Sequence, residues 1–348
     1  MAEYSVSSIS KYDKDALSRV DALLEKEGIK RDRNLDYTCG VYDEDYSLIA
    51  TGSAFGNTLR CFAVSSDHQG EGLMNTVMSH LLDFEMGRGI SHVFVYTKAK
   101  SAKFFMDMGF YEIARVEGLF VFLENRKNGF PSYLENLAES AVPDGVSGAV
   151  VMNANPFTKG HRYLIEKAAS QCDTLHVFVV SEDKSLVPFS IRKRLVEKGI
   201  ADLGNVVVHE SGPYMISNAT FPSYFIADEA GVMEGHARLD VNVFKKIAGV
   251  MNITKRFVGD EPFSAITSLY NRVLSSELPR AGIECCIIPR LEEGGVPVSA
   301  SNVRLALQND DWDTLEKILP QTSLDFFRSG EAGPVIYAIK QEKDVIHH

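Results

Sequence analysis

A threonine and a histidine, Thr158 and His161, have a spacing that suits phosphate chemistry. They follow an apolar strand expected at 148–152, and they open a helix expected at 161–169. The N-terminus of a helix offers unpaired N–H groups and a partial positive charge, which suit phosphate groups. Because the two residues are three apart, a loop-to-helix turn can aim both at one point. A histidine there can donate hydrogen bonds to a phosphate in the transition state.

The neighbours of this pair shape the turn in which it lies. Pro156 prevents an early helix and turns the chain. Gly160 removes a side chain where a ligand could approach closely, and Lys159 adds a positive charge. The alternative is that His161 is only a cap or a packing residue, which is the commoner role of a histidine in this setting. The preceding strand and the run Asn-Ala-Asn-Pro-Phe at 153–157 favour the binding interpretation.

A second polar segment near the end of the chain has a similar character. Ser299, Ser301 and Arg304 mark the start of another expected helix. Either serine is also a good N-cap, which is the structural alternative. In the functional interpretation, the hydroxyl groups and the guanidinium bind the β and γ phosphates of a nucleotide, because a planar guanidinium matches phosphate oxygens.

The elements that must position these residues form two patterns. The second part of the chain alternates between strands and helices, which predicts a doubly wound parallel sheet with ligands beyond the carboxyl ends of its strands. The first part mixes a run of strands with helices, which predicts an α+β sheet domain. The expected strands are 37–42, 47–55, 59–64, 92–96, 119–123, 148–152, 174–180, 206–209, 256–259 and 285–288, and the expected helices are 15–26, 73–88, 99–108, 161–169, 191–203 and 264–274.

A change in composition between about 124 and 148 marks the expected domain boundary. This stretch mixes charged residues with Gly and Pro and contains a short helical pattern. We therefore predict an N-terminal domain at 1–130, a connector at 131–146 and a C-terminal domain at 147–348. The predicted fold class is α/β, with an α+β domain followed by a Rossmann-like parallel sheet.

The composition limits the classes of function. The chain has 348 residues, of which 45% are hydrophobic and 24% are charged, as is typical of globular proteins. A net charge of -11 argues against broad binding to nucleic acid. No apolar stretch approaches the ~18 residues of a membrane-spanning helix. Five cysteines without a disulfide or metal-type spacing, and the absence of a secretory signal, predict a cytoplasmic protein with reduced thiols.

The two polar segments together resemble the HIGH-type nucleotidyltransferase superfamily, whose enzymes direct attack on the α-phosphate of ATP. Here the first motif reads Thr-Lys-Gly-His, with Thr in place of the family's first His, and the second reads Ser-Ala-Ser-Asn-Val-Arg. The segments 217–225, 240–244 and 256–262 are similar to the catalytic half of citrate lyase ligases. By this resemblance, Gly259, Asp260 and Glu261 line the adenine and ribose side.

The resemblance implies a complete set of site residues. Arg192 could reach phosphates or simply cover a helix face. The implied catalytic residues are His161, Thr158, Lys159 and Arg304. The implied ATP-binding residues are Asn153, Asn155, Pro156, Phe157, Gly160, Arg192, Gly259, Asp260, Glu261, Ser299 and Ser301.

The first domain resembles the GNAT acetyltransferases. Gln69, Gly70 and Gly72 follow an expected strand and open a helix, as in the loop that binds the diphosphate of coenzyme A in that family. The segment 99–112 is similar to a later helix of the family and its Gly-Phe turn. Met74 departs from the pattern, because the family has Gly or Ala there and the larger side chain narrows the loop. We nominate no general base in this domain.

A GNAT-like half joined to a HIGH-type half is the arrangement of citrate lyase ligases. The resemblance implies that acetate, ATP and the thiol form of citrate lyase give AMP, diphosphate and the acetylated lyase. It implies ATP and Mg²⁺ as cofactors, and a CoA-like prosthetic group on the acyl carrier subunit as partner. Three alternatives stay open: an adenylyltransferase for another phosphate acceptor, an amine acetyltransferase with a regulatory nucleotide domain, and a non-catalytic nucleotide-binding protein.

Overall fold

The computed structural model describes residues 4–32, 34–182, 185–215, 229–260 and 265–343. Contacts divide the chain into an N-terminal unit, Met1–Ser132 with Phe221–Asn242, and a C-terminal unit, Tyr133–Thr220 with Val243–His348. The long helix α7 (Glu229–Met251) contributes its first part to one unit and its second part to the other. The domain bounds 1–130, 131–146 and 147–348 stay predictions.

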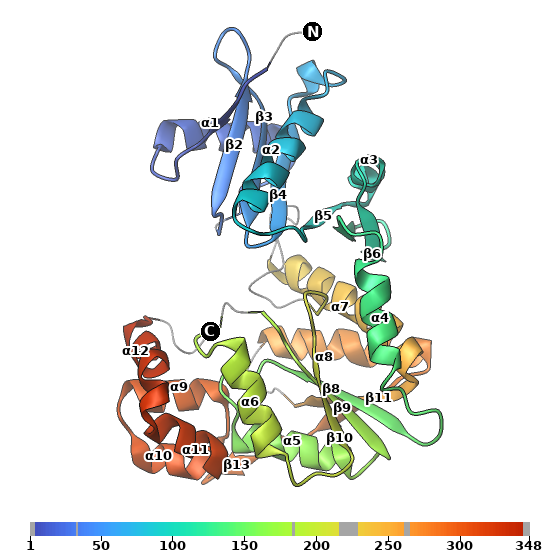
Figure 1. Cartoon of the computed structure of the whole chain (residues 1–348), viewed down its shortest axis with the longest axis vertical. Helices are drawn as coiled ribbons and strands as arrows, with labels where there is room; N and C mark the ends of the chain where they lie inside the picture. Colours follow the sequence, from blue (N-terminus) through green and yellow to red (C-terminus); the bar gives the residue numbers. More distant parts are fainter. Residues whose placement is uncertain (1–3, 33, 183–184, 216–228, 261–264, 344–348) are drawn as a thin grey trace. The chain divides into compact units, whose positions relative to one another are not determined.

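The N-terminal unit is built on a seven-stranded mixed sheet (Figure 1). Its strands are β1 (Val6–Ser8), β2 (Tyr37–Tyr42), β3 (Leu48–Phe55), β4 (Thr58–Val64), β5 (Phe94–Lys98), β6 (Tyr111–Val116) and β7 (Phe120–Glu124). Their order in the sheet is β1-β2-β3-β4-β5-β7-β6. Three helices, α1 (Lys14–Lys26), α2 (Leu73–Gly87) and α3 (Ala102–Asp107), pack apolar residues against it.

The sheet changes character between β4 and β5. These strands are parallel and pair only through Thr58 with Phe94 and Leu59 with Val95, whereas the other neighbouring strands run antiparallel. The register of β4 against β3 also shifts near Cys61, which has a φ of 53°. Such an irregularity bends a strand and increases its local twist.

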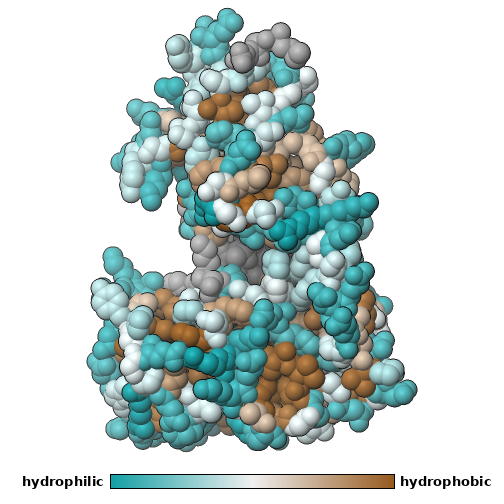
Figure 2. Space-filling view, viewed as in Figure 1, coloured by the Kyte–Doolittle hydropathy of each residue, from teal (hydrophilic) through white to brown (hydrophobic). Residues whose placement is uncertain are grey.

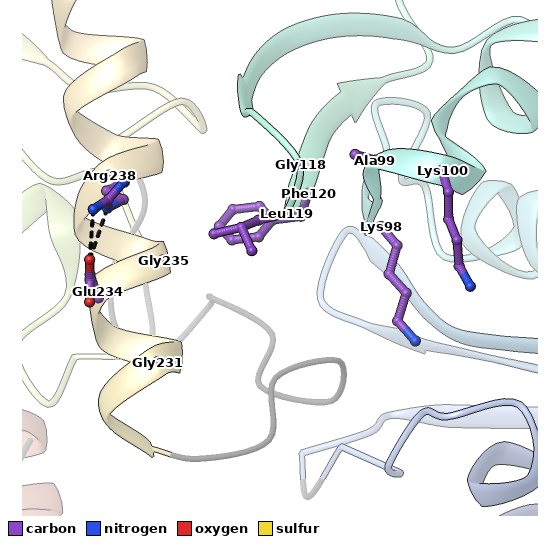
Figure 3. Close-up of a pocket in the computed structure, with 10 residues that line it drawn as sticks. All are labelled: Lys98, Ala99, Lys100, Gly118, Leu119, Phe120, Gly231, Glu234, Gly235 and Arg238. Carbon is purple, nitrogen blue, oxygen red and sulfur yellow. Dashed lines mark hydrogen bonds and ion pairs between the residues drawn. The ribbon is translucent and has the colours of Figure 1, made fainter.

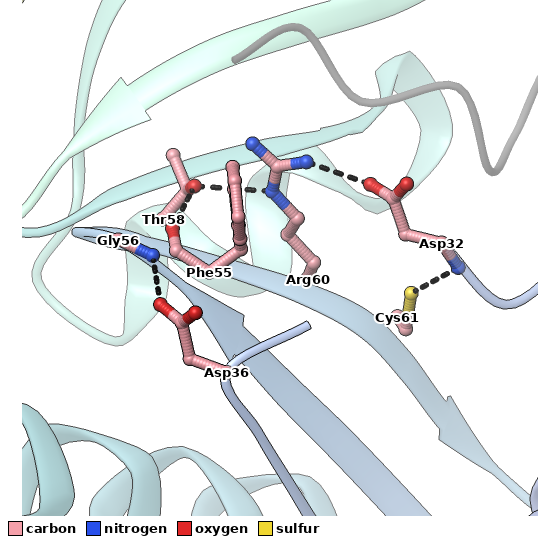
Figure 4. Close-up of polar contacts among 7 residues, drawn as sticks. All are labelled: Asp32, Asp36, Phe55, Gly56, Thr58, Arg60 and Cys61. Carbon is pink, nitrogen blue, oxygen red and sulfur yellow. Dashed lines mark hydrogen bonds and ion pairs between the residues drawn. The ribbon is translucent and has the colours of Figure 1, made fainter. Parts of the chain in front are cut away.

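A buried ion pair anchors the start of β4 (Figure 4). Arg60, which is 1% exposed, donates from Nη1 to Oδ2 of Asp32 at 2.6 Å and from Nε to Oγ1 of Thr58 at 3.0 Å. Its guanidinium also lies 4.8 Å from the centre of the Phe55 ring. The pair joins the segment before β2 to β4. Removal of either charge would leave the other one buried without a partner charge.

The C-terminal unit contains a five-stranded sheet in the order β10-β9-β8-β11-β12, with all neighbours parallel. Its strands are β8 (Ser147–Met152), β9 (Thr174–Val179), β10 (Val206–Glu210), β11 (Ile253–Gly259) and β12 (Glu284–Ile288). Its helices are α5 (Lys159–Ala169), α6 (Phe189–Gly199), α8 (Ala265–Glu277), α9 (Ala300–Gln308), α10 (Trp312–Ile318), α11 (Gln321–Arg328) and α12 (Gly333–Gln341). The predicted α/β fold class, a mixed sheet followed by a parallel one, is confirmed.

Several elements depart from the expectations. The segment expected as a helix at 99–108 begins as a short 3₁₀ turn, η2 (Ala99–Ser101), before α3. The edge strands β1 and β6 were not expected, because β1 has three residues and β6 begins with two exposed ones. The helix α4 (Gly129–Ala138), the two-residue strands β13 (Glu292–Glu293) and β14 (Val296–Pro297), and α7 complete the order. No helix in the described ranges is long and apolar enough to span a membrane.

Candidate active site

The candidate site lies where the strand order of the C-terminal sheet reverses. Strand β8 pairs with β9 on one side and with β11 on the other. In open parallel sheets, ligands bind at the carboxyl ends of the strands beside such a reversal. The loop after β8 starts at Asn153 and the loop after β11 starts at Asp260. Two of the predicted segments therefore leave the sheet at the point where this fold places ligands.

Thr158 and His161 form a capping box at the start of α5. The Thr158 Oγ1 accepts a hydrogen bond from the His161 N–H at 3.2 Å, and the His161 Nδ1 accepts one from the Thr158 N–H at 3.1 Å. The Thr158 hydroxyl also lies 2.9 Å from the same Nδ1. This reciprocal pair satisfies N–H groups that a helix end otherwise leaves open.

The capping box determines which nitrogen of His161 carries the proton. Because Nδ1 accepts from a backbone N–H, the proton of the neutral ring lies on Nε2. Burial and the positive charge of Arg290 lower the pKa of His161 to about 4, so the ring is neutral near pH 7. The structure therefore presents His161 as a neutral hydrogen-bond donor at the N-terminus of α5.

The structure brings the two predicted motifs together. A Cβ added to Gly160 would lie 2.5 Å from the carbonyl oxygen of Val298, so the start of α5 approaches the segment before α9 closely. Arg304 is 2% exposed and donates from Nη1 to the carbonyl oxygen of Asn155 at 2.6 Å and from Nη2 to Oγ of Ser301 at 3.3 Å. Burial lowers the pKa of Arg304 to about 10, which leaves it charged at neutral pH.

Ser299 has the structural role that the alternative interpretation assigned to it. Its hydroxyl accepts a hydrogen bond from the Asn302 N–H at 3.1 Å and so caps α9. Ser301 lies one turn before Arg304, and its hydroxyl oxygen accepts a hydrogen bond from the Arg304 guanidinium. The N-terminus of α9 thus lies next to the loop after β8, through the contact between Arg304 and Asn155.

Lys159 has a different environment from the one expected. Its ammonium group donates to the carbonyl oxygens of Glu316 at 3.0 Å and Lys317 at 2.6 Å, in the last turn of α10. A positive charge is favourable at the C-terminus of a helix, where carbonyl groups lack partners. These contacts favour a role in docking α10 against α5.

Arg192 binds protein carbonyl groups from two loops. It is fully buried in α6 and donates to the backbone oxygens of Val187 at 2.9 Å, Asn153 at 2.7 Å and Val180 at 2.8 Å, and also to that of Glu182. A further bond of 2.8 Å reaches the side-chain oxygen of Asn153. This guanidinium therefore ties the loop after β8 to the loop after β9, which is a positioning role.

Asn155 offers a donor in the same loop. Its side-chain oxygen accepts from the Val187 N–H at 3.0 Å, whereas its Nδ2 is buried and has no hydrogen-bond partner among the described residues. Buried polar groups are nearly always hydrogen-bonded, so such a donor needs an explanation. A ligand oxygen at the carboxyl end of β8 would provide one.

Pro156 and Phe157 form the buried interior of the loop. The Asn155–Pro156 peptide is cis, and Phe157 is fully buried in the core of the unit. The Phe157 ring packs so closely on α6 that it leaves no room for a Cβ at Gly199. The ring also stacks with His161 at a centroid distance of 5.9 Å. Phe157 thus packs against the His161 ring.

Strand β11 ends at Gly259, and Asp260 begins the loop that follows it. The Gly259 oxygen accepts from Nδ2 of Asn271 at 3.0 Å, and the position of its missing Cβ is open. Arg290, just beyond β12, donates from Nε to the Asp260 oxygen at 3.0 Å. Sequence reasoning missed Arg290, although its place directly after the strand that ends at Ile288 was a usable signal.

Some of the predicted segments fall outside the described residues. Glu261 is one of them, as is the segment 217–225 that resembles citrate lyase ligases. The described residues contain no group of three or more His, Cys, Asp or Glu that could hold a metal ion.

The predicted diphosphate turn of the N-terminal unit is exposed and precedes α2. Gly70 and Gly72 have φ values of 88° and 77°, which only glycine adopts readily. Gln69 is exposed beside them. Glu71, between the two glycines, accepts a hydrogen bond from the Tyr4 hydroxyl at 2.5 Å and lies 3.2 Å from Nδ1 of His68.

Comparison with known proteins identifies relatives over most of the chain. The model of the citrate lyase ligase C-terminal domain matches residues 147–327. The [Citrate [pro-3S]-lyase] ligase of Escherichia coli (strain K12) is 37% identical over 309 residues, which covers 86% of this chain and 88% of that protein. The enzyme of the same name from Klebsiella pneumoniae is 36% identical over 319 residues, covering 90% and 93%.

Solved structures match the N-terminal part. A putative acyl-CoA N-acyltransferase from Klebsiella pneumoniae covers 36% of this chain and 97% of its own, with 12% identity and a TM-score of 0.30. The family assignment depends on the sequence relatives, because they cover both units and the family model covers the candidate site. This chain belongs to the citrate lyase ligase family.

Proposed function

We propose that this chain uses ATP to acetylate the thiol of the prosthetic group on the acyl carrier subunit of citrate lyase. Acetate and ATP would give AMP and diphosphate as the lyase becomes acetylated. Membership of the citrate lyase ligase family supports the overall reaction. The observation that carries the mechanism is the neutral His161, which presents its Nε2–H at a helix N-terminus beside the reversal of strand order.

The reaction divides into two balanced steps. A carboxylate oxygen of acetate attacks the α-phosphorus of ATP, the bond to the β,γ-diphosphate breaks, and acetyl-AMP forms. The thiolate of the prosthetic group then attacks the acetyl carbon, and AMP leaves with the electron pair of the broken anhydride bond. The thiol proton is released to solvent. The first step builds charge on the phosphates, and the second step requires access for the thiol and the loss of its proton.

The groups around the reversal of strand order suit the first step. The Nε2–H of His161 and the N–H groups of α5 would donate to phosphate oxygens. Arg304 and the hydroxyl groups of Ser299 and Ser301 would stabilise the departing diphosphate, because the contact with Asn155 places Arg304 beside the same loop. The buried Nδ2 of Asn155 would donate to a further ligand oxygen. ATP enters as its magnesium complex, in which the ion reduces the charge on the phosphates.

The remaining predicted residues would support or extend this site. Lys159 and Arg192 would act by positioning α10 and the two loops, as their contacts suggest. Gly259, Asp260 and Glu261 would line the ribose and adenine side at the end of β11. Gln69, Gly70 and Gly72 would contact the CoA-like arm of the carrier. We also place the reaction in the cytoplasm, which the five free cysteines support.

Isotope exchange tests the proposal at its first step. The full chain would be incubated with ATP, Mg²⁺ and labelled diphosphate, with and without acetate, in the absence of the carrier. Label that enters ATP only when acetate is present establishes an acyl-adenylate. If no exchange occurs, the assay is repeated with deacetylated citrate lyase. Failure to form AMP under those conditions would reject the proposed reaction.

A further inference from the structure

The N-terminal unit contains a cavity to which no role has been given (Figure 3). It has a volume of about 570 Å³, within the range of small-molecule pockets. Its lining comes from the end of β5 with η2, from the turn between β6 and β7, and from the first part of α7. All of these segments belong to the N-terminal unit. None of the residues of the turn at 69–72 lines it.

Positive side chains dominate the polar part of the cavity. Lys98, Lys100 and Arg238 line it, against the single carboxylate of Glu234, which pairs with Arg238 at 2.8 Å. Lys98 is half-buried and donates to the carbonyl oxygen of Gly28 at 2.8 Å. Burial and the neighbouring, exposed Lys100 both lower the pKa of Lys98, as expected where a second cation lies near a partly buried one. An anion would relieve this repulsion.

The cavity wall is apolar at the turn between β6 and β7. Leu119 and Phe120 project from this turn toward α7, as Figure 3 shows. Leu119 is 53% exposed, so the core of the unit does not account for it. A ligand that matches the whole cavity therefore combines an anionic group for the lysines with a longer, less polar chain for Leu119.

We propose that this cavity receives the phosphate-bearing thiol arm of the carrier subunit. The inference depends on the proposed function, because that reaction requires such an arm as the acetyl acceptor. The arm's phosphate would lie near Lys100 and Lys98, and its chain would lie along Leu119. The phosphate of the arm would then lie at the lysines of this cavity rather than at the turn at 69–72, so the two placements are alternatives that the cavity variants distinguish.

Binding of free 4′-phosphopantetheine to the full chain tests the inference directly. Titration calorimetry at low salt would compare the native chain with Lys100→Glu and with Lys127→Glu, an exposed lysine of the same unit outside the cavity. Leu119→Asp would be paired with Met86→Asp, which changes another exposed apolar residue. We expect the two cavity variants to raise the Kd at least tenfold and the two controls to leave it unchanged.

Several results would overturn the inference. One is that 4′-phosphopantetheine does not bind to the native chain. Another is that the cavity variants and their controls lose affinity for it equally. A third is that inorganic phosphate binds with equal affinity, which would indicate a simple anion site. Kinetics separate the carrier's arm from free coenzyme A. In the cavity variants, we expect a higher KM for deacetylated citrate lyase. We expect their rate of acetate-dependent diphosphate exchange, measured without the carrier, to stay unchanged. An unchanged KM would reject the carrier arm as occupant, whereas lost exchange in the native chain would reject the proposed function itself.

Discussion

A histidine whose pKa is about 4 keeps one charge state across the neutral range. The ring of His161 is therefore neutral and a hydrogen-bond donor through Nε2. Its contribution grows with the negative charge that develops on the phosphate oxygens, because a hydrogen bond to a charged acceptor is stronger than one to a neutral acceptor. Under the proposed function, His161 would therefore act by charge stabilisation through its Nε2–H.

Replacement of His161 by Ala tests this role. Removal of one such donor lowers kcat by about 10²–10³-fold in comparable sites, and we expect a loss of this order in acetate-dependent exchange. His80→Ala, on α2 of the N-terminal unit, is the matched control and should retain native exchange. We also expect the pH profile of the exchange rate to lack a step near pH 6.5 that could be assigned to His161. A step assigned to His161 would be present in the native chain and absent in His161→Ala. Such a step would mean that the ring changes charge during the reaction.

Arg192 shows how burial changes the meaning of a charged residue. At the start of the expected helix 191–203, Arg192 is consistent by sequence with a phosphate ligand or with a structural role. Its guanidinium binds four backbone oxygens in the structure, so it connects loops whose carbonyl groups would otherwise lack partners. Lys159 is a similar case at the end of α10.

At the scale of elements, β9 and β10 carry a pair of histidines, of which His176 is buried and His209 is half-buried. Nδ1 of His176 lies 2.9 Å from Nε2 of His209, and the His209 ring stacks on Phe178 at 5.0 Å. One proton can lie between the two nitrogens, whereas two protonated rings would direct N–H groups at each other. Burial lowers the pKa of both rings, and the proximity of His176 further lowers the pKa of His209 to about 4.

This pair should make the C-terminal unit sensitive to acid. The unfolded chain binds protons near pH 6.5, whereas in the folded chain the pKa of His209 is about 4 and that of His176 is lowered. The stabilisation is therefore complete above pH 6.5 and is lost as pH falls toward 4. We expect urea unfolding to show a fall of about 1–2 kcal/mol between pH 7 and pH 5 that is smaller in His209→Phe. An equal fall in the variant would assign the effect to other groups, including His161.

Elements with a strong internal pattern were predicted accurately. Strand β2 and the start of α2 coincide with the expected ranges, and β8, β9 and β12 differ by one residue at most at either end. Helix α5 begins two residues earlier than expected, because Thr158 caps it and Gly160 lies within its first turn. The apolar pattern shows where a helix is buried, but its first turn is determined by hydrogen bonds of the cap.

At the scale of the whole molecule, the two units give the chain two separate chemical environments. The candidate ATP site lies in the C-terminal unit, and the cationic cavity lies in the N-terminal unit. Helix α7 belongs to both, with the boundary after Asn242. A nucleotide that binds only the folded C-terminal unit should therefore stabilise that unit by mass action.

Hydrogen exchange with a non-hydrolysable ATP analogue measures this selectivity. We expect slower exchange of the amides at 153–162 and 299–304, since ligand contacts and the capping hydrogen bonds suppress local opening there. Amides in β2 and β3 should keep their rates. Protection confined to the turn at 69–72 would instead place the nucleotide in the N-terminal unit and contradict the assignment of the site.

The sequence by itself determined the two kinds of sheet, the two polar motifs and the family that they resemble. These follow from local information, because apolar periodicity, turn residues and short motifs are properties of neighbouring positions. Only the tertiary structure decided that Arg304 would contact Asn155, that Gly160 would lie against Val298, and that Lys159 would bind α10. Those contacts join positions about 140 to 160 residues apart, and their partners are chosen by packing and by the need to pair buried polar groups.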